Sequence, residues 1–545
     1  MTADRTDPLA GDRADPVAAT PYGAVRGRYE NGVAVFRGIP YAAPPFGPRR
    51  FRPPEPPEPW DGVRDAGSFG PTAPKPPYSE AFAPYLSDPV VPGDDCLNLN
   101  VWTPEPGPGA RLPVLVWLHG GALTRGSSAV PVYDGHAFAR DGVVLVSVNY
   151  RLGVEGYGLF PDAPANPGLR DQLAALLWVH EAIGAFGGDP GRITLAGQSA
   201  GAIGAAALIA APQTRGLVRR AVLQSGPPEA GDRDRVRRVV RRMAARLKVP
   251  ATAEAFAAVD RGLLLRTQAE AGRLAGPVLG GPAFGIVVDG DLVPRDPLEA
   301  LTDGAAAGVG LLMGWTRDEY RLWLVPGGLL ERVDRLGGLA LAGAMARCRC
   351  GGDVPRGYRA LHPEAGTAET VGQMITDHLL RLPLHRLAGA RTEASYVYEF
   401  AWPSRRPGLK ACHALELGFV FDTGRAPEAR KLAGEGAPQE LADALHGAWV
   451  RFAAQGDPGW ERWDARHPVR VFGDGPGPGG PAPEGAEAAG PYTAYGPRDA
   501  ELALWAASVP PAGSAPGPAG GPPPRGTEPR SVVRRLRRPG ALRRP

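Results

Sequence analysis

Short apolar runs alternate with longer polar or helix-patterned segments along most of the chain. The runs cover residues 97–102, 114–118, 143–148, 193–196, 221–224, 309–313, 396–400 and 469–472. Continuous apolar stretches of this length are typical of strands that are buried on both faces of a sheet. Their alternation with helical segments predicts the α/β class, with a mostly parallel central sheet flanked by helices.

Helical patterning is clearest at residues 169–186, where leucines recur at helical spacing before the break at Gly187. Two later segments, about 229–275 and 326–392, are rich in Arg, Ala and Leu and also show helix-like patterning. Both segments lie between predicted strands. We therefore expect them to be helical insertions that form a cap over the sheet.

The two ends of the chain differ from its middle. Residues 1–19 intersperse Asp, Arg and Pro, whereas a secretory peptide needs a continuous apolar centre. We therefore expect this segment to be a disordered N-terminus and not a secretory peptide. Residues 20–508 hold the predicted strands, beginning with an antiparallel hairpin around an Asn31-Gly32 turn signal. Pro and Gly dominate after that, and residues 509–545 are expected to be a disordered tail.

Composition and charge limit the partners. The chain of 545 residues is 43% hydrophobic, which can supply a core, yet no segment reaches the roughly 18 apolar residues that span a bilayer. The formal charge of +4 depends on residues 530–545, which carry seven Arg and no acid and leave the remainder at −3. We expect a solvated basic tail, no nucleic-acid partner, no membrane span and a monomer.

The four cysteines are Cys96, Cys348, Cys350 and Cys412, a sparse set without the paired Cys-x-x-Cys units of a zinc site. Free thiols in a reducing compartment are the simplest interpretation. The sequence thus predicts a cytoplasmic protein, with no metal and no cofactor.

One pentad carries the chemistry of a nucleophile. Ser199 lies in Gly197-Gln198-Ser199-Ala200-Gly201, between an apolar strand and an Ala-rich helix. In this context the pentad predicts a nucleophile elbow, a sharp turn that projects the serine hydroxyl above the sheet. A base must then remove the hydroxyl proton.

The oxyanion that such an attack creates needs fixed donors. The strand at 114–118 runs into a Gly-containing turn, where the N–H groups of Gly121 and Ala122 can face outward. Together with the Ala200 N–H, they are the candidate oxyanion hole. The residues alone do not choose between the carboxylates Asp318 and Glu319 as the partner of the base.

Further segments, in order, resemble the type-B carboxylesterase and cholinesterase family of α/β hydrolases. They are FRGIPYAAPPFG at 36–47, DDCLNLNVW at 94–102, NYRLG at 149–153 and FGGDP at 186–190. The resemblance covers most of the chain and implies an α/β-hydrolase fold, with the helical insertions capping the active site of a carboxylesterase domain at residues 20–508.

The resemblance also implies the remaining site residues. GWTRDE at 314–319 resembles the motif whose final glutamate completes the triad, which makes Glu319 the acid. CHALELGFVF at 412–421 resembles the segment of the catalytic histidine, which makes His413 the base, and the other eight histidines are expected to be structural. Ser225 resembles a serine that supports the acid. The order serine, glutamate, histidine is that of α/β hydrolases.

An ion pair between Arg50 and Asp94 is implied as well. Three departures from the family pattern stand out: Gln198 where Glu is usual, Ala122 where a third Gly is common, and Cys96 without its loop-closing partner. The neutral Gln198 argues against cationic substrates, and the Ala122 methyl group narrows the oxyanion pocket.

The sequence thus predicts a carboxylic ester hydrolase that acts through an acyl-enzyme on small to medium, uncharged esters. Amide, carbamate or thioester hydrolysis on the same site is the alternative. A catalytically inactive binding protein of the same family is a further alternative, which the complete set of triad residues disfavours.

Overall fold

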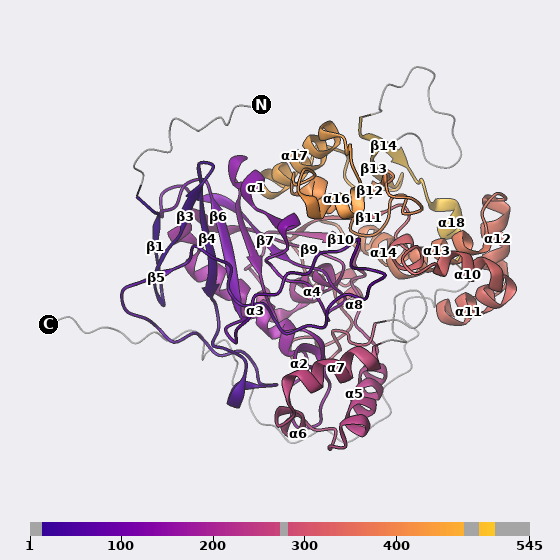
Figure 1. The fold of residues 1–545 in the computed structure, drawn as a ribbon. Coiled ribbons are helices and arrows are strands. Elements are labelled where there is room, and N and C mark those ends of the chain that lie inside the picture. The colour runs from indigo at the N-terminus through magenta and orange to yellow at the C-terminus, as the bar shows by residue number, and fades with distance from the viewer. Residues whose placement is uncertain (1–13, 273–281, 474–489, 507–545) are drawn as a thin grey trace, which may run out of the picture.

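An eleven-stranded sheet forms the centre of the computed structural model, which describes residues 14–272, 282–473 and 490–506 (Figure 1). In spatial order its strands are β14 (Tyr492–Tyr495), β13 (Pro468–Phe472), β12 (Ser395–Phe400), β11 (Gly310–Thr316), β10 (Arg220–Gln224), β9 (Gly188–Gln198), β7 (Leu112–Leu118), β8 (Val144–Val148), β6 (Asn98–Thr103), β4 (Val33–Pro40) and β3 (Arg28–Glu30). The neighbours from β13 to β8 pair in parallel, and the pairs at both edges are antiparallel. All eight predicted apolar runs overlap these strands, so the predicted α/β class is confirmed.

Helices cover both faces of the sheet, so the central strands are buried on both sides. On β7, Val114 and Val116 belong to the core beneath α3 and α4, whereas Leu115 and Trp117 belong to the core beneath α1 and α17. The flanking helices are α1 (His136–Arg140), α2 (Gly153–Tyr157), α3 (Pro167–Ala182), α4 (Ala200–Ala210), α8 (Pro297–Thr302), α14 (Leu382–Ala390), α15 (Leu417–Val420), α16 (Pro427–Ala433) and α17 (Gln439–Gln455). The helix predicted at 169–186 is α3 with the 3₁₀ turn that follows it.

The N-terminal segment is more ordered than the sequence suggested. The predicted hairpin is β3–β4, with Asn31 and Gly32 at positive φ in its turn. Two strands ahead of it, β1 (Val17–Thr20) and β2 (Gly23–Arg26), and one after it, β5 (Val63–Asp65), form a small second sheet. The expectation of disorder up to residue 19 is therefore wrong from residue 17 onward, because β1 pairs with β2 and buries Ala18. Residues 1–13 and the predicted tail lie outside the described residues.

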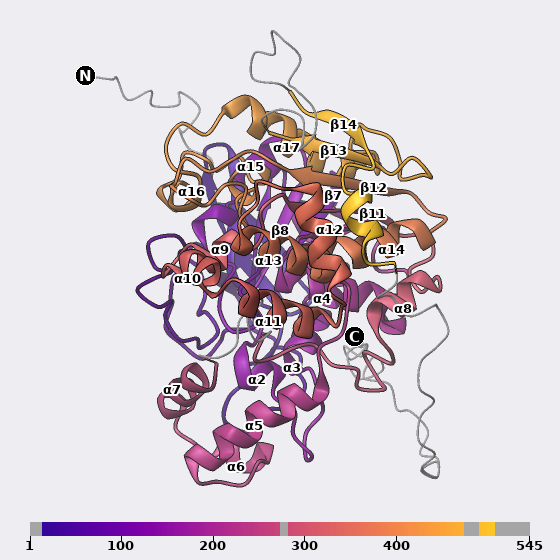
Figure 2. The same cartoon turned by 90° about the vertical axis from the view of Figure 1, so that its right-hand side faces the viewer.

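The two predicted insertions form two separate helical clusters (Figures 1 and 2). The first holds α5 (Arg233–Leu247), α6 (Ala253–Ala257) and α7 (Arg261–Ala271), and the second holds α9 (Arg321–Leu324), α10 (Leu329–Leu336), α11 (Gly338–Cys348), α12 (Asp353–Leu361) and α13 (Thr367–Thr376). The second cluster has its own small hydrophobic core, to which Trp505 after the last described helix, α18 (Asp499–Ala503), contributes. In Figure 2 this cluster lies in front of the sheet.

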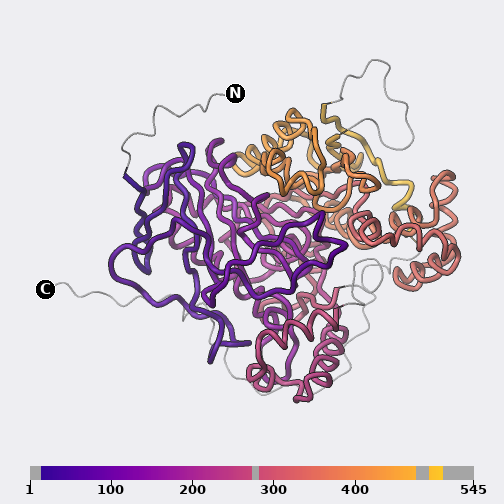
Figure 3. Tube along the Cα trace, in the orientation of Figure 1, coloured from indigo at the N-terminus to yellow at the C-terminus, as the bar shows by residue number. Residues whose placement is uncertain are grey.

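Short helical turns lie between several of the longer elements. They are the 3₁₀ turns η1 (Gly47–Arg49), η2 (Pro131–Tyr133), η3 (Ile183–Phe186) and η4 (Pro212–Thr214), and the π-helical turn η5 (Asp377–Arg381). The trace in Figure 3 follows the chain from the N-terminal edge of the sheet to β13 and β14 at the opposite edge.

The implied ion pair between Arg50 and Asp94 is wrong. Nε of Arg50 lies 2.7 Å from Oε1 of Glu155, and Oδ1 of Asp94 lies 2.8 Å from Nη1 of Arg261. The Arg50 guanidinium is buried and also donates to two backbone carbonyls beside α6, so it fixes the first insertion to the body of the domain.

The four cysteines are free thiols, as predicted. Within the described ranges, no helix is both long enough and apolar enough to cross a membrane.

Candidate active site

Ser199 occupies the sharp turn between β9 and α4. Its backbone angles, φ 56° and ψ −123°, lie outside the regions that L-residues ordinarily adopt. Glycines permit this turn: a Cβ on Gly197 would lie 2.3 Å from the carbonyl carbon of Gly201, and a Cβ on Gly201 would lie 1.9 Å from the oxygen of Leu118. The helix therefore starts in direct contact with the ends of β7 and β9, which is the geometry of a nucleophile elbow.

A short hydrogen bond joins the predicted base to the predicted acid. His413 Nδ1 lies 2.5 Å from Glu319 Oε2, and both side chains are buried. Glu319 follows β11 and His413 follows β12, so two neighbouring parallel strands bring together residues that are far apart in the chain. Because the carboxylate accepts the Nδ1 proton, Nε2 of His413 carries the free lone pair.

Three groups keep Glu319 ionised. Burial alone would raise the pKa of this carboxyl, but His413, Ser225 and the Thr316 N–H together hold it below its usual value. The Thr316 N–H donates to Oε1 at 2.8 Å. Ser225 Oγ is buried beside the carboxylate, although its geometry falls short of a hydrogen bond.

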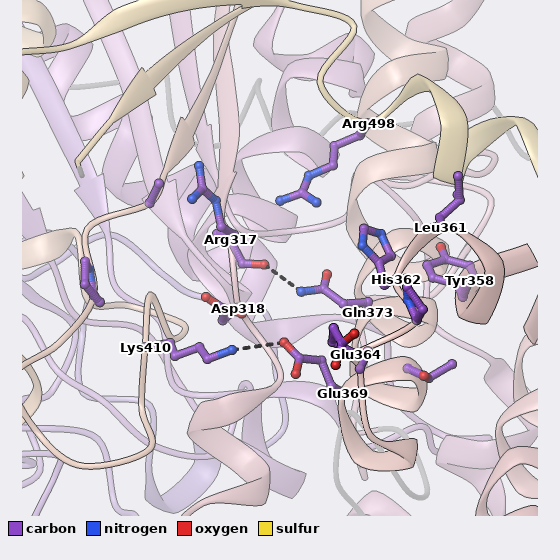
Figure 4. Close-up of a pocket in the computed structure, with 15 residues that line it drawn as sticks. Arg317, Asp318, Tyr358, Leu361, His362, Glu364, Glu369, Gln373, Lys410 and Arg498 are labelled. Carbon is purple, nitrogen blue, oxygen red and sulfur yellow. Dashed lines mark hydrogen bonds and ion pairs between the residues drawn. The ribbon is translucent and has the colours of Figure 1, made fainter. Parts of the chain in front are cut away.

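Asp318, the neighbouring carboxylate, lies in other surroundings. It lines a cavity of about 640 Å³ together with Arg317, Lys410 and Glu369, which Figure 4 shows in close-up. Its carboxylate accepts the Ala411 N–H at 3.3 Å, and burial raises its pKa. The carboxylate in hydrogen-bond contact with His413 belongs to Glu319.

Gln198 contacts the other nitrogen of the imidazole. Its Nε2 lies 3.1 Å from Nε2 of His413, and its Oε1 lies towards Gly120. Since Nδ1 of His413 holds the ring proton, the Gln198 amide donates to the Nε2 lone pair. In the described part of the chain, the hydrogen-bond partner of this lone pair is therefore Gln198 and not Ser199.

The turn after β7 presents free N–H groups beside Ser199. A Cβ on Gly120 would lie 3.3 Å from the Cβ of Ser199. Gly121 has a φ of 121° and Ala122 a φ of 54°, so the chain runs through the left-handed region where only Gly is unstrained. Among the described residues, the N–H groups of Gly121 and Ala122 donate to no other residue. The Ala200 N–H is the first of α4 and has no acceptor within that helix.

His119 supports this turn. Its Nδ1 lies 2.8 Å from the Gly120 carbonyl oxygen, its ring stacks on Tyr150 at 4.3 Å, and the Tyr150 hydroxyl donates to its carbonyl oxygen. Burial lowers the pKa of His119 to about 3, so it is neutral at physiological pH. This arrangement fits the structural role that the sequence predicted for it.

Two neighbours of His413 were not predicted. Trp323 of α9 packs on the imidazole at 4.6 Å between ring centroids, and no local pattern marks this tryptophan. Glu416 is fully buried, and burial together with Glu319 raises its pKa to about 7. Its Oε1 accepts a hydrogen bond from Gln224 at 3.2 Å, whereas its Oε2 has no partner among the described residues. The family motif contains Glu416, but only burial indicates its protonation.

Comparisons with known proteins agree on one family. The model of the carboxylesterase family matches residues 14–469. The para-nitrobenzyl esterase of Bacillus subtilis (strain 168) is 36% identical over 468 residues, which cover 83% of this chain and 92% of that protein. The phenmedipham hydrolase of Pseudarthrobacter oxydans is 35% identical, with 87% and 96% covered.

Solved structures give the same result. A carboxylesterase of Geobacillus stearothermophilus matches with a TM-score of 0.77 and 36% identity, covering 90% of this chain and 99% of that one. A thermophilic para-nitrobenzyl esterase matches with a TM-score of 0.76 and 30% identity, covering 90% and 100%. The chain therefore belongs to the carboxylesterase family and is a serine carboxylic ester hydrolase with the α/β-hydrolase fold.

Proposed function

We propose that the chain hydrolyses uncharged esters through a triad of Ser199, His413 and Glu319. The observation that carries this assignment is the 2.5 Å hydrogen bond between Glu319 and His413, formed at the carboxyl ends of two strands of the same parallel sheet as the strand that delivers Ser199. The strained backbone of Ser199 supports its role, because such a conformation is retained where it exposes a nucleophile.

In the proposed reaction, His413 Nε2 accepts the proton of Ser199 while Oγ attacks the ester carbonyl. For this step the Gln198 amide must give up the Nε2 lone pair to the serine hydroxyl. Glu319 stabilises the imidazolium that forms. The protonated His413 then gives its proton to the departing alkoxide, and an acyl-enzyme results.

The N–H groups of Gly121, Ala122 and Ala200 are the proposed oxyanion hole. Donors that are already fixed stabilise the developing charge without reorganising, and removal of one donor in such a site costs about a hundredfold or more in rate. Water, activated by His413, then attacks the acyl-enzyme and releases the acid. Ser225 supports Glu319 by facing its carboxylate.

Uncharged substrates are favoured by the electrostatics around the base. The residue beside the nucleophile is the neutral Gln198, and Glu416 has a pKa of about 7, so it is largely protonated below that pH. Glu319 is the one carboxylate in contact with His413 among the described residues, and its charge is matched when the imidazolium forms. A permanent cation on the substrate would therefore find little compensation here.

Carbamate hydrolysis is the second candidate function. The observation in its favour is the 35% identity to a phenmedipham hydrolase over nearly its full length. The same triad and oxyanion hole serve a carbamate, because attack on its carbonyl creates the same tetrahedral oxyanion. Thioesters and amides differ in the leaving group that His413 must protonate.

A substrate panel tests the proposal. We expect p-nitrophenyl esters of short acids to be hydrolysed, and a series of acyl and alcohol lengths, with one carbamate, one thioester and one amide, ranks the candidate functions. Ser199→Ala should lose at least about a thousandfold of kcat. An organophosphate should label the wild type and not this variant. Wild-type protein that neither hydrolyses the panel nor takes the label would overturn the proposal.

The acid is tested by a matched pair of neighbours. Glu319→Gln should lose about a thousandfold or more of kcat, because the amide no longer stabilises the imidazolium. Asp318→Asn removes the adjacent buried carboxylate and should stay within about tenfold of wild type. Equal losses in the two variants would contradict the assignment of Glu319.

A further inference from the structure

Three side chains from distant parts of the chain converge at the side of the sheet opposite to the N-terminal strands. His385 lies on α14, His467 lies directly before β13, and Asp499 begins α18. One ligand atom from each residue lies within 4.8 Å of the other two. We propose that His385, His467 and Asp499 form a binding site for a divalent transition metal ion of the zinc type.

The pair of His467 and Asp499 is held in place by its surroundings. Nδ1 of His467 lies 2.9 Å from Oδ2 and 3.0 Å from Oδ1 of Asp499. The His467 ring stacks on Trp463 at 4.8 Å with an interplanar angle of 10°. Gly496 makes room for the carboxylate, because a Cβ there would lie 2.3 Å from Oδ2. Neither ligand can turn away without losing these contacts.

His385 completes the group. Its ring meets Trp463 edge to face at 4.6 Å and lies 5.4 Å from the His467 ring, measured between centroids. Its Nε2 is buried and has no hydrogen-bond partner among the described residues. The contact between His467 and Asp499 alone leaves Nε2 of His385 without a partner, whereas buried polar atoms ordinarily have one. A metal ion shared with His467 and Asp499 accounts for it.

The donor set selects the class of ion. Two imidazoles and one carboxylate suit Zn²⁺ and its neighbours in the transition series, whereas Mg²⁺ and Ca²⁺ prefer oxygen ligands. Metal–ligand bonds of about 2.1 Å bring ligand atoms to within roughly 4 Å of one another, so a small rotation of the side chains closes the site. A metal ion bound by Nδ1 of His467 requires that nitrogen to be free of its proton, which moves to Nε2 of the same ring or to solvent, and water fills the fourth position.

The site would brace the C-terminal part of the described chain. α18 is joined to its surroundings by other side chains as well: Arg498 at its start pairs with Glu399 of β12, and Glu501 contacts His362. An ion held by α14, β13 and α18 joins three segments that the sequence separates, and it stabilises the folded state by binding that state alone. The cysteine spacing gave no sign of it, because these ligands share no local motif.

Zinc binding to the full-length protein tests the proposal directly. After treatment with a chelator and its removal, we expect isothermal titration calorimetry with Zn²⁺ to show one saturable site per chain and scanning calorimetry to show a higher Tm with Zn²⁺. Co²⁺ in place of Zn²⁺ should give the visible absorption of a nitrogen- and oxygen-bound ion. His385→Ala and Asp499→Asn should each weaken Zn²⁺ binding at least about tenfold.

His362→Ala is the matched control. It removes another histidine that contacts a carboxylate of α18, Glu501 at 3.0 Å, and leaves the three proposed ligands intact. It should bind Zn²⁺ as wild type does. Asp499 is exposed, so Asp499→Asn gives a folded comparison even where His385→Ala is destabilised. No saturable binding by wild type, or binding by Asp499→Asn as tight as that of wild type, would overturn the proposal.

Discussion

Replacement of Gln198 by Glu tests the most distinctive contact of the active site. In the wild type the Gln198 amide donates to His413 Nε2 at 3.1 Å, an arrangement that requires the neutral imidazole. An ionised carboxylate at this position accepts a hydrogen bond instead and thus favours the imidazolium. Because only the neutral imidazole can take the proton of Ser199, Gln198→Glu should weaken the base at neutral pH.

The magnitude follows from the distance. An opposite charge within about 4–6 Å ordinarily shifts a titration by one to three units. We therefore expect the acid limb of the kcat/KM profile to move to higher pH by about one to three units, with little change on the alkaline plateau. Gln198→Met keeps the size of the side chain but removes the donor. A single hydrogen bond contributes about 0.5–1.5 kcal/mol net, so its acid limb should move by about one unit or less in the same direction.

The assay is hydrolysis of a neutral p-nitrophenyl ester from pH 5 to 9, with correction for loss of folded protein. Gln213→Glu is the control for added charge, since Gln213 lies beyond the far end of α4, roughly 15 Å from the elbow by the rise of a helix. Its profile should coincide with that of wild type. If the acid limb of Gln198→Glu also stays in place, the reasoning that places Gln198 against the base is refuted.

Two further predictions concern the buried carboxyl and the oxyanion turn. The pKa of Glu416 is about 7 in the folded state against an ordinary value of 4.5, so the folded protein holds this proton more tightly than the unfolded chain does. The free energy of unfolding should therefore fall by up to about 3 kcal/mol as the pH rises from 4.5 past 7. Glu416→Gln should abolish that decline in denaturant titrations at pH 5 and 8, and an unchanged decline would contradict it. Ala122→Gly should relieve the strain at φ 54°, stabilise the protein by up to about 1 kcal/mol and raise kcat/KM for esters of bulky alcohols more than for ethyl esters. Equal changes for both esters would show that the methyl group does not narrow the pocket.

Burial explains which parts of the fold could be predicted from the sequence. The strands of the parallel sheet are covered on both faces, so each must be a continuous apolar run, and such runs are visible in the sequence. The strands that were missed lie at edges: all three residues of β5 are exposed and none of β14 is fully buried. Edge strands need no apolar pattern, because their pairing depends on backbone groups and on where the neighbouring chain happens to lie.

The active site could be predicted unevenly for a similar reason. Ser199 lies in a local motif whose glycines are required by close contacts within a few residues. Glu319 and His413 meet only because β11 and β12 are neighbours in the sheet, so their pairing has no local signal and family resemblance had to supply it. The mistaken pair of Arg50 and Asp94 shows the limit of that approach, since resemblance carries residues over but not the partners that this chain offers them.

Gln198 and Glu416 are connected through the sheet. Gln198 and Gln224 are register partners in β9 and β10, and the Gln224 amide donates to Glu416. One buried carboxylate, Glu319, is compensated by His413 in the proposed reaction. A second ionised carboxylate in the same region, Glu416, would have no cation in contact with it among the described residues. Burial, together with the charge of Glu319, therefore raises the pKa of Glu416 to about 7. A neutral residue at position 198 avoids adding a third acid to the group, so the departure from the family pattern at Gln198 fits a site in which negative charge is kept to Glu319, the proposed acid of the triad.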